Sequence, residues 1–175
     1  MKATGVVRRI DELGRIVIPK EIRRTLKIKE GTPLEIYSDD NGELILKKYS
    51  PILEISSFAQ EVAQSIYDSI EVNAIIANLD RVIAFNSKCK SFENKLIDKA
   101  IERLINARQC KILTSLELHT MFFADKVISN FGVCPIMQSG DVYGAIIIFK
   151  DNAIIDDADL KVAKALADFL GKQVG

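Results

Sequence analysis

The residues with the clearest chemistry are positive charges gathered near the start of the 175-residue chain. Residues 1–29 contain 9 lysines and arginines against 3 acidic residues, whereas the whole chain is balanced, with 24 of each sign. A basic segment in an otherwise neutral protein indicates that this segment alone meets a polyanion. Arginine suits such a partner because its planar guanidinium binds phosphates and guanine edges with two parallel hydrogen bonds.

A short helix, predicted from about Lys20 to Leu26, places several of these charges on one side. Pro19 fits its start, since proline lacks the N–H that a first turn leaves unpaired. At 100° per residue, Ile22 and Leu26 share an apolar face, and the opposite face carries only cations. These cations are Lys20, Arg23, Arg24 and Lys27. A solvated basic face is the ordinary explanation of such a pattern, but arginines on the preceding strands extend the charge and favour a DNA-binding surface. They are Arg8, Arg9 and Arg15.

The elements that must position these charges form a ββαββ pattern in the first fifty residues. Strands are predicted at Ala3–Ile10, Arg15–Ile18, Leu34–Tyr37 and Leu44–Leu46, with turns at residues 11–14 and 39–42. A domain this small, without cysteines, makes a poor core alone, and the segment Ile16–Ile18 is apolar on both faces. We therefore expect two chains to interleave their hairpins in a symmetric dimer.

The motif LGRxVIPxExRRxL, residues 13–26, resembles the AbrB-type swapped-hairpin DNA-binding domain, and the resemblance covers residues 1 to about 51. It implies an intertwined homodimer that binds double-stranded DNA at loosely defined A/T-rich promoter sites, by shape more than by a strict base code. The DNA-contacting arginines that carry over from the family are Arg8, Arg15, Arg23 and Arg24. Charge placement alone adds Lys2, Arg9, Lys20 and Lys27. The alternative for Arg8 or Arg15 is an ion pair inside the dimer, with Asp11, Glu12 or Glu21.

The remaining residues, 52–175, predict an α+β domain between two flanking helices. Apolar residues at spacings of three and four indicate helices over 52–70, 93–109 and 156–174. Strands are predicted at 73–78, 81–86, 126–133 and 143–149. The fold class is therefore mixed, with a β-rich ββαββ domain at residues 1–51 and an α+β domain at residues 52–175.

This second domain resembles a GAF domain, through the pattern PIxxxGxxxGAxxxF at residues 135–149. The resemblance implies a regulatory or oligomerising unit, with room for a small-molecule effector whose identity and contact residues stay open. Four side chains are considered as pocket linings and favoured as core: Phe122, Phe123, Phe131 and Met137. The flanking helices either pack on their own sheet or join two dimers into a homotetramer, and the resemblance favours the tetramer.

Several classes of function find no support in the sequence. We find no defensible catalytic constellation, since His119 is the only histidine and is not adjacent to Cys110, so an enzyme is not expected. Three widely spaced cysteines without a CxxC argue against a disulfide framework or a metal site and are expected to be reduced. The longest apolar stretch, residues 145–149, is too short to span a bilayer. Nothing resembles a signal peptide, so a cytoplasmic protein is expected.

The combination of the two domains resembles transcription regulators of endospore-forming bacteria. It implies an activator and repressor of sporulation genes that works in the developing forespore. The alternative is an AbrB/MazE-like antitoxin, which binds DNA through the same kind of domain and neutralises a toxin. Antitoxins usually end in a short, poorly ordered tail, and the patterned apolar residues after position 51 count against this alternative.

Overall fold

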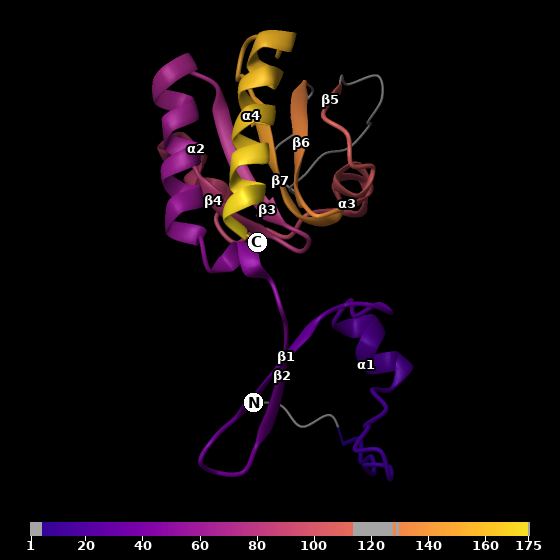
Figure 1. The fold of residues 1–175 in the computed structure, drawn as a ribbon. Coiled ribbons are helices and arrows are strands. Elements are labelled where there is room, and N and C mark those ends of the chain that lie inside the picture. Colours follow the sequence, from indigo (N-terminus) through magenta and orange to yellow (C-terminus); the bar gives the residue numbers. More distant parts are fainter. Residues whose placement is uncertain (1–4, 114–127, 129, 175) are drawn as a thin grey trace. The chain divides into compact units, whose positions relative to one another are not determined.

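The chain folds into two compact units in the computed structural model, which describes residues 5–113, 128 and 130–174. The N-terminal unit comprises residues 1–49 and the C-terminal unit residues 50–175 (Figure 1). Among the described residues, no helix combines the length and apolar character that crossing a bilayer requires.

The N-terminal unit contains one helix and one hairpin. Helix α1 spans Lys20–Thr25, and strands β1 (Leu34–Ser38) and β2 (Leu44–Lys48) pair antiparallel. The helix and both strands lie where the sequence predicts them, within one or two residues. Residues 5–18 form no strand within this single chain, although the sequence predicts strands up to Ile10 and from Arg15. The physical reason is that these apolar segments have no neighbouring strand in one chain to pair with.

Two loops of the N-terminal unit share one hydrogen-bonding pattern. The amide of Asp11 donates to the carbonyl of Arg15 (3.0 Å), the amide of Gly14 donates to the carbonyl of Asp11 (3.0 Å), and the Asp11 carboxylate accepts from two further amides. Asp39, Gly42 and Glu43 repeat every one of these bonds in the loop between β1 and β2. The glycines have φ of 74° and 78°, the left-handed region that this loop requires. The first loop is therefore folded as a hairpin loop, although its flanking segments are unpaired.

No described residue of the N-terminal unit is fully buried. Large apolar side chains instead stay in solvent, including Val7 (84% exposed), Val17 (72%) and Ile36 (66%). A single chain therefore leaves the apolar surface of this unit uncovered.

The C-terminal unit is built on a five-stranded antiparallel sheet in the order β4-β3-β7-β6-β5 (Figure 1). The strands are β3 (Asn73–Asn78), β4 (Val82–Phe85), β5 (Lys111–Leu113), β6 (Phe131–Gln138) and β7 (Asp141–Phe149). The helices are α2 (Ser56–Ile70), α3 (Lys99–Asn106) and α4 (Asp157–Val174), with short 3-10 helices η1 (Pro51–Leu53) and η2 (Ser87–Phe92).

Each face of the sheet has its own core, because alternate residues of a strand point to opposite sides. Ile146 and Ile148 of β7 pack towards α2 and α4, whereas Ile147 and Phe149 pack towards η2 and α3. Figure 1 shows α2 and α4 side by side over one face of the sheet. The result is a three-layered unit with two apolar cores.

Three predicted elements have different bounds in the structure. Pro51 starts a 3-10 turn, so the helix predicted from residue 52 begins at Ser56. The helix predicted over 93–109 is only α3, because Asn94 adopts a positive φ of 56° and Asp98 caps the helix by accepting from the amide of Ile101 at 2.8 Å. The strand predicted at 126–133 is β6, which begins at Phe131; residues 126, 127 and 129 lie outside the described part.

Helix α2 closes one edge of the sheet with amide side chains. Gln60 accepts a hydrogen bond from the amide of Phe85 at 3.2 Å and donates to the carbonyl of the same residue. One turn further, Gln64 accepts from the amide of Ser87 at 2.9 Å. Because β4 is an edge strand, these bonds satisfy backbone groups that no neighbouring strand reaches.

Candidate nucleic-acid interface

Helix α1 is held at its two ends by backbone geometry. Pro19 precedes it and contributes no side-chain cap. After the cap residue Leu26, Lys27 adopts a left-handed φ of 51°, which turns the chain away from the helix. The amide of Ile28 then donates to the carbonyl of Arg23 (2.8 Å), and the amide of Lys27 donates to that of Arg24 (3.3 Å), the pattern of a Schellman motif. Ile22 is the one residue of α1 that is partly buried, as the predicted apolar face requires.

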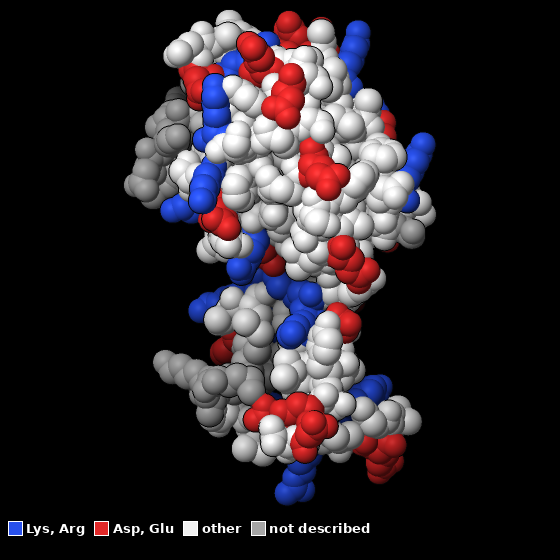
Figure 2. Space-filling view, turned by 90° about the vertical axis from the view of Figure 1, so that its left-hand side faces the viewer, with Lys and Arg blue, Asp and Glu red and all other residues white. Residues whose placement is uncertain are grey.

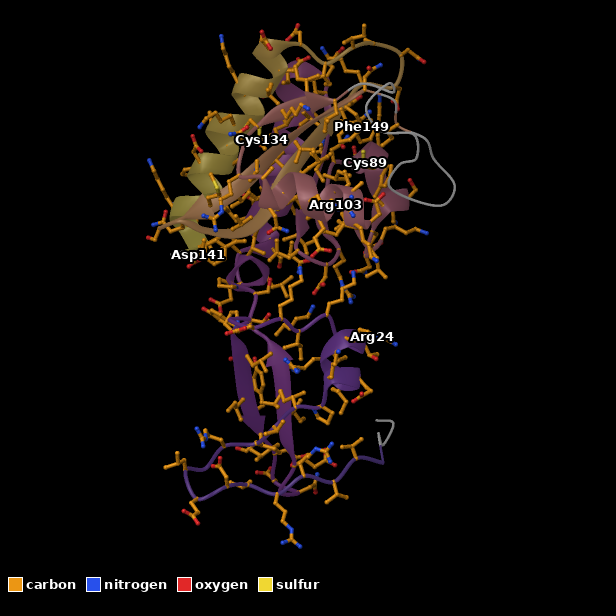
Figure 3. The ribbon with its side chains drawn as sticks, turned by 90° about the vertical axis from the view of Figure 1, so that its right-hand side faces the viewer. Arg24, Cys89, Arg103, Cys134, Asp141 and Phe149 are labelled. Atoms are coloured by element: carbon orange, nitrogen blue, oxygen red, sulfur yellow. The ribbon has the colours of Figure 1, made fainter. Side chains whose placement is uncertain are left out.

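The structure leaves the predicted cations in solvent. Those that lie in the described part are all exposed: Arg8, Arg9, Arg15, Lys20, Arg23, Arg24 and Lys27. Lys2, the remaining candidate, lies outside the described residues. Within residues 5–49, the guanidinium groups of Arg23 and Arg24 form no ion pair with a carboxylate, and Figure 3 shows Arg24 extending outward from α1. The two arginines are therefore available to an external anion.

Arg15 differs from the helix arginines because it has a partner in its own chain. Its Nε lies 2.8 Å from Oδ2 of Asp11, and both side chains are largely in solvent. The alternative role foreseen for Arg15, an ion pair with Asp11, is thus present within one chain. An exposed pair of this kind contributes little to stability, so Arg15 can exchange the carboxylate for a phosphate at small cost. Arg8 donates to the carbonyl of Val7 at 3.0 Å.

Two loop carboxylates of the N-terminal unit were not considered as site residues from the sequence. Hydrogen bonds from the Arg15 amide and side chain lower the pKa of Asp11. A hydrogen bond from the amide of Glu43 is the main cause that lowers the pKa of Asp39. The sequence signal was present, since Asp-x-x-Gly occurs in both loops and allows the aspartate to cap the turn. Both carboxylates are thus held in the charged form that the loops require.

The electrostatic arrangement differs between the two units. In residues 5–29 the exposed cations outnumber the carboxylates, and those on α1 share one side of a helix. Figure 2 shows the charges of the C-terminal unit, where lysines and arginines are interspersed with aspartates and glutamates among uncharged atoms. A surface of the first kind can bind the phosphates of a duplex, and one of the second kind has no preferred sign of partner.

The residues considered for an effector pocket in the C-terminal unit divide into two groups. Phe131 is buried in the core that faces α3, and Met137 is partly buried near the end of β6. The position of Phe131 agrees with the favoured core role. Phe122, Phe123 and His119 lie outside the described residues.

Two protein families match the sequence. Residues 54–175 match the family described as stage V sporulation protein T C-terminal, transcription factor. Residues 7–54 match the family described as antidote-toxin recognition MazE, bacterial antitoxin. The two matches divide the chain close to the boundary between the structural units.

Two relatives from Bacillus subtilis (strain 168) cover different parts of the chain. Stage V sporulation protein T is 43% identical over 176 residues, which is 99% of this chain and 99% of that protein. Transition state regulatory protein AbrB is 65% identical over 51 residues, which is 29% of this chain and 52% of that protein. The first relative therefore spans both units, and the second matches only the unit with the basic helix.

Among solved structures, the GAF domain of phosphoenolpyruvate-protein phosphotransferase from Acinetobacter covers 70% of this chain and 87% of its own. Its TM-score is 0.60 at 12% identity. At this identity the similarity concerns the fold alone, and it confirms the GAF-like fold predicted for the C-terminal unit.

Proposed function

The chain belongs to the stage V sporulation protein T family of transcription factors, and from this membership we propose that it is a DNA-binding regulator of sporulation genes that activates some promoters and represses others. The observation that carries the proposal is the unopposed basic side of α1, in a unit that is 65% identical to AbrB. The N-terminal unit binds DNA, and the C-terminal unit regulates or assembles the protein.

The binding form is a homodimer through the N-terminal units. The support is the absence of any fully buried residue among residues 5–49, together with the apolar side chains exposed there. A second chain that paired with residues 5–18 would cover this surface and double the number of cations at the interface. Arg8, Arg15, Arg23 and Arg24 are the principal DNA contacts, with Lys2, Arg9, Lys20 and Lys27 around them.

The site preferred on DNA is A/T-rich. The support is the resemblance to the AbrB-type domain, which implies discrimination through groove width and deformability more than through a strict base code. The site of action that follows from this membership is the cytoplasm of the developing forespore.

Two such dimers join into a homotetramer through the flanking helices. The support lies on α2 and α4, where Phe58 and Phe169 stack edge to face with centroids 5.5 Å apart. Phe169 remains 43% exposed, so this aromatic pair offers an apolar contact to another chain. A small molecule bound in the C-terminal unit would regulate DNA binding only if it favoured one assembly geometry over another.

The antitoxin alternative has one observation in its favour, the MazE match at residues 7–54. Against it, residues 54–175 belong to a transcription-factor family and fold around two cores, unlike a short toxin-binding tail. A small toxin gene beside this one would favour the alternative.

The test replaces Arg23 and Arg24 together by alanine in the full-length protein. We expect binding to an A/T-rich duplex to be lost at moderate salt, because two exposed cations disappear from each chain of the dimer. Where residual binding can be measured, log K should fall less steeply with log salt, by about 0.9 for each phosphate contact removed. Fluorescence anisotropy over a salt series measures both effects.

The matched control removes the same charge from the other unit, by Lys99→Ala with Arg103→Ala on α3, where both side chains are exposed. This variant should bind DNA as the unchanged protein does. Equal weakening in both variants would contradict an interface on α1. Light scattering on each variant establishes that the assembly state is unaltered.

A further inference from the structure

Two of the three cysteines lie opposite each other on neighbouring strands. In the antiparallel pairing of β5 with β6, Lys111 faces Val133 and Ile112 faces Gly132. One step back along this register places Cys110, just before β5, opposite Cys134. Residues directly opposite in an antiparallel pair share one face of the sheet, with Cβ atoms about 4.5–5.5 Å apart. The two thiols are hydrogen-bonded to each other.

The surroundings of the two thiols are unequal. Cys134 is completely buried, and its Sγ lies 3.8 Å from the carbonyl oxygen of Leu160 on α4. Cys110 is only partly buried, at the edge strand of the sheet. Lys164 and Asp168 of α4 face the pair with opposite charges and are themselves joined at 2.5 Å. A solvent reagent therefore reaches Cys110 before Cys134.

The hydrogen bond between the thiols also moves their pKa values apart. A side-chain hydrogen bond with Cys134 lowers the pKa of Cys110. The bond to Cys110, together with burial, raises the pKa of Cys134. Since the thiolate is the nucleophilic form, both accessibility and acidity select Cys110 as the sulfur that reacts first.

We propose that Cys110 and Cys134 form a modification site at which a hydroperoxide is reduced and a disulfide forms within one chain. The Cys110 thiolate attacks the peroxide, the O–O bond breaks, and Cys110 becomes a sulfenic acid while the alkoxide or hydroxide takes up a proton. The Cys134 sulfur then displaces the hydroxyl group, and its proton leaves with that group as water. In total, two thiols and one hydroperoxide give one disulfide, one alcohol or water, and one further water.

Cys89 provides an internal comparison. It is buried in the core on the opposite face of the sheet, whereas Cys134 belongs to the core beneath α2 and α4. Figure 3 shows Cys89 and Cys134 on the two sides of the sheet. Cys89 therefore cannot pair with either cysteine of the site. Ordinary reducing conditions keep all three cysteines in the thiol form, and oxidation at the pair is transient, as is typical of disulfides formed inside cells.

The test exposes the reduced full-length protein to hydrogen peroxide, blocks the remaining thiols and digests with trypsin without reductant. The sequence places Cys110 in the tripeptide 109–111 and Cys134 in the peptide 127–150. We expect these two peptides to be recovered joined, with a mass two hydrogens below their sum. Free peptide 127–150 after full oxidation of Cys110, or cross-links only between chains, would overturn the proposal.

Two variants test the order of the steps. Cys110→Ser should leave Cys134 reduced at the same peroxide dose, whereas Cys134→Ala should accumulate a Cys110 sulfenic acid that dimedone traps. Cys89→Ala is the matched control and should form the joined peptides as before. If a core variant fails to fold, the native protein still decides, because iodoacetamide should alkylate Cys110 at least about tenfold faster than Cys134. Equal rates, or undiminished oxidation of Cys134 in the Cys110→Ser variant, would contradict the assignment.

Discussion

The two units of this chain differ in whether one copy of the sequence can bury its own apolar residues. In the C-terminal unit, the isoleucines of β3 and β7 lie at or near complete burial between helices and sheet. In the described part of the N-terminal unit, no side chain reaches full burial, although valines and isoleucines are frequent there. Burial of apolar area is the dominant favourable term in folding. The contrast therefore supports the proposal that one unit folds alone and the other folds only with a partner.

The difference in burial between the two units also bears on which unit binds DNA. A unit with its own core can change its surface charges without consequence for DNA, and its charges are mixed in sign. In the dimer proposed above, two basic helices come together when the unit folds, so that the DNA-binding surface forms only when two chains associate. In this view, the exposed apolar surface of the N-terminal unit is the condition for its function.

The largest expected effect comes from dilution of the separate units. Residues 1–51 should lose their circular dichroism signal as concentration falls, because the folded form requires two chains. Residues 50–175 should keep theirs at every concentration, whatever their association state, because each copy holds both cores. Thermal melts over a hundredfold range of concentration measure the difference. A concentration-independent melt of residues 1–51, with a monomer by sedimentation, would contradict the comparison.

The next effect concerns one isoleucine from each unit. Ile146→Ala should lower the free energy of unfolding of the C-terminal unit by about 2–5 kcal/mol, since this side chain is completely buried. Ile16 is 53% exposed in the single chain, yet Ile16→Ala should cost about 2 kcal/mol if a partner covers it. Denaturant unfolding of the full-length protein, monitored separately for each unit by hydrogen exchange, measures both.

The outcome for Ile16 decides whether this side chain is exposed in solution, as it is in a single chain, or is covered by a second chain. A substitution at a position that stays exposed usually changes stability by no more than about 0.5 kcal/mol. A change that small at Ile16, beside the full cost at Ile146, would remove the support for a covering partner.

A smaller effect is expected at the edge of the C-terminal sheet. Gln60→Ala removes a side chain that both donates to and accepts from the backbone of Phe85. It should destabilise this unit by about 1–3 kcal/mol, the cost of leaving partly buried backbone groups without a partner. Gln173→Ala, at an exposed position near the end of α4, is the control and should be neutral. If both variants are equally stable, the hydrogen bonds from α2 do not stabilise the edge strand β4. The C-terminal unit would then have an unprotected strand edge, as the N-terminal unit has in a single chain.

Much of the fold could be predicted from the sequence, because its strongest signals are local. The basic side of α1, the hairpin at residues 39–42 and the alternating apolar residues of β7 all follow from spacing within a few residues. The start of α3 and the start of β6 could not be predicted, because a positive φ at Asn94 and the pairing of Phe131 with β5 depend on tertiary contacts. The spacing of side chains along the sequence reveals neither the backbone conformation of Asn94 nor the partner strand of Phe131.

The cations of the candidate site could be predicted from the sequence, whereas the role of its carboxylates could not. Charge and motif selected Arg23 and Arg24, since helix geometry alone puts them on one side. The role of Asp11 was foreseen only as an ion-pair partner, whereas the structure uses its carboxylate chiefly to cap a loop. The opposition of Cys110 and Cys134 was invisible because 23 residues separate them in sequence, and only the register of β5 with β6 brings them together.

The smallest effect concerns how helices end in the two units. Helix α3 of the C-terminal unit begins at a side-chain cap from Asp98, whereas α1 is followed, after its cap residue Leu26, by Lys27 in a left-handed conformation that glycine adopts more readily. Lys27→Gly should therefore stabilise the end of α1 by about 0.5–1 kcal/mol. The measurement is slower hydrogen exchange at the amide of Ile28, which donates to Arg23 across this end.

Lys27→Ala separates conformation from charge. It removes the same charge as Lys27→Gly but keeps a side chain at a positive φ, so it should not slow exchange at Ile28. Both variants should weaken DNA binding equally if the lysine ammonium contacts phosphate. Since one contact is worth about 0.9 in the salt slope of log K, the same small decrease should appear in both titrations. Weaker binding by Lys27→Ala alone would mean that the helix end, and not the charge of Lys27, matters to DNA, and α1 would then depend on local backbone geometry as α3 depends on its cap.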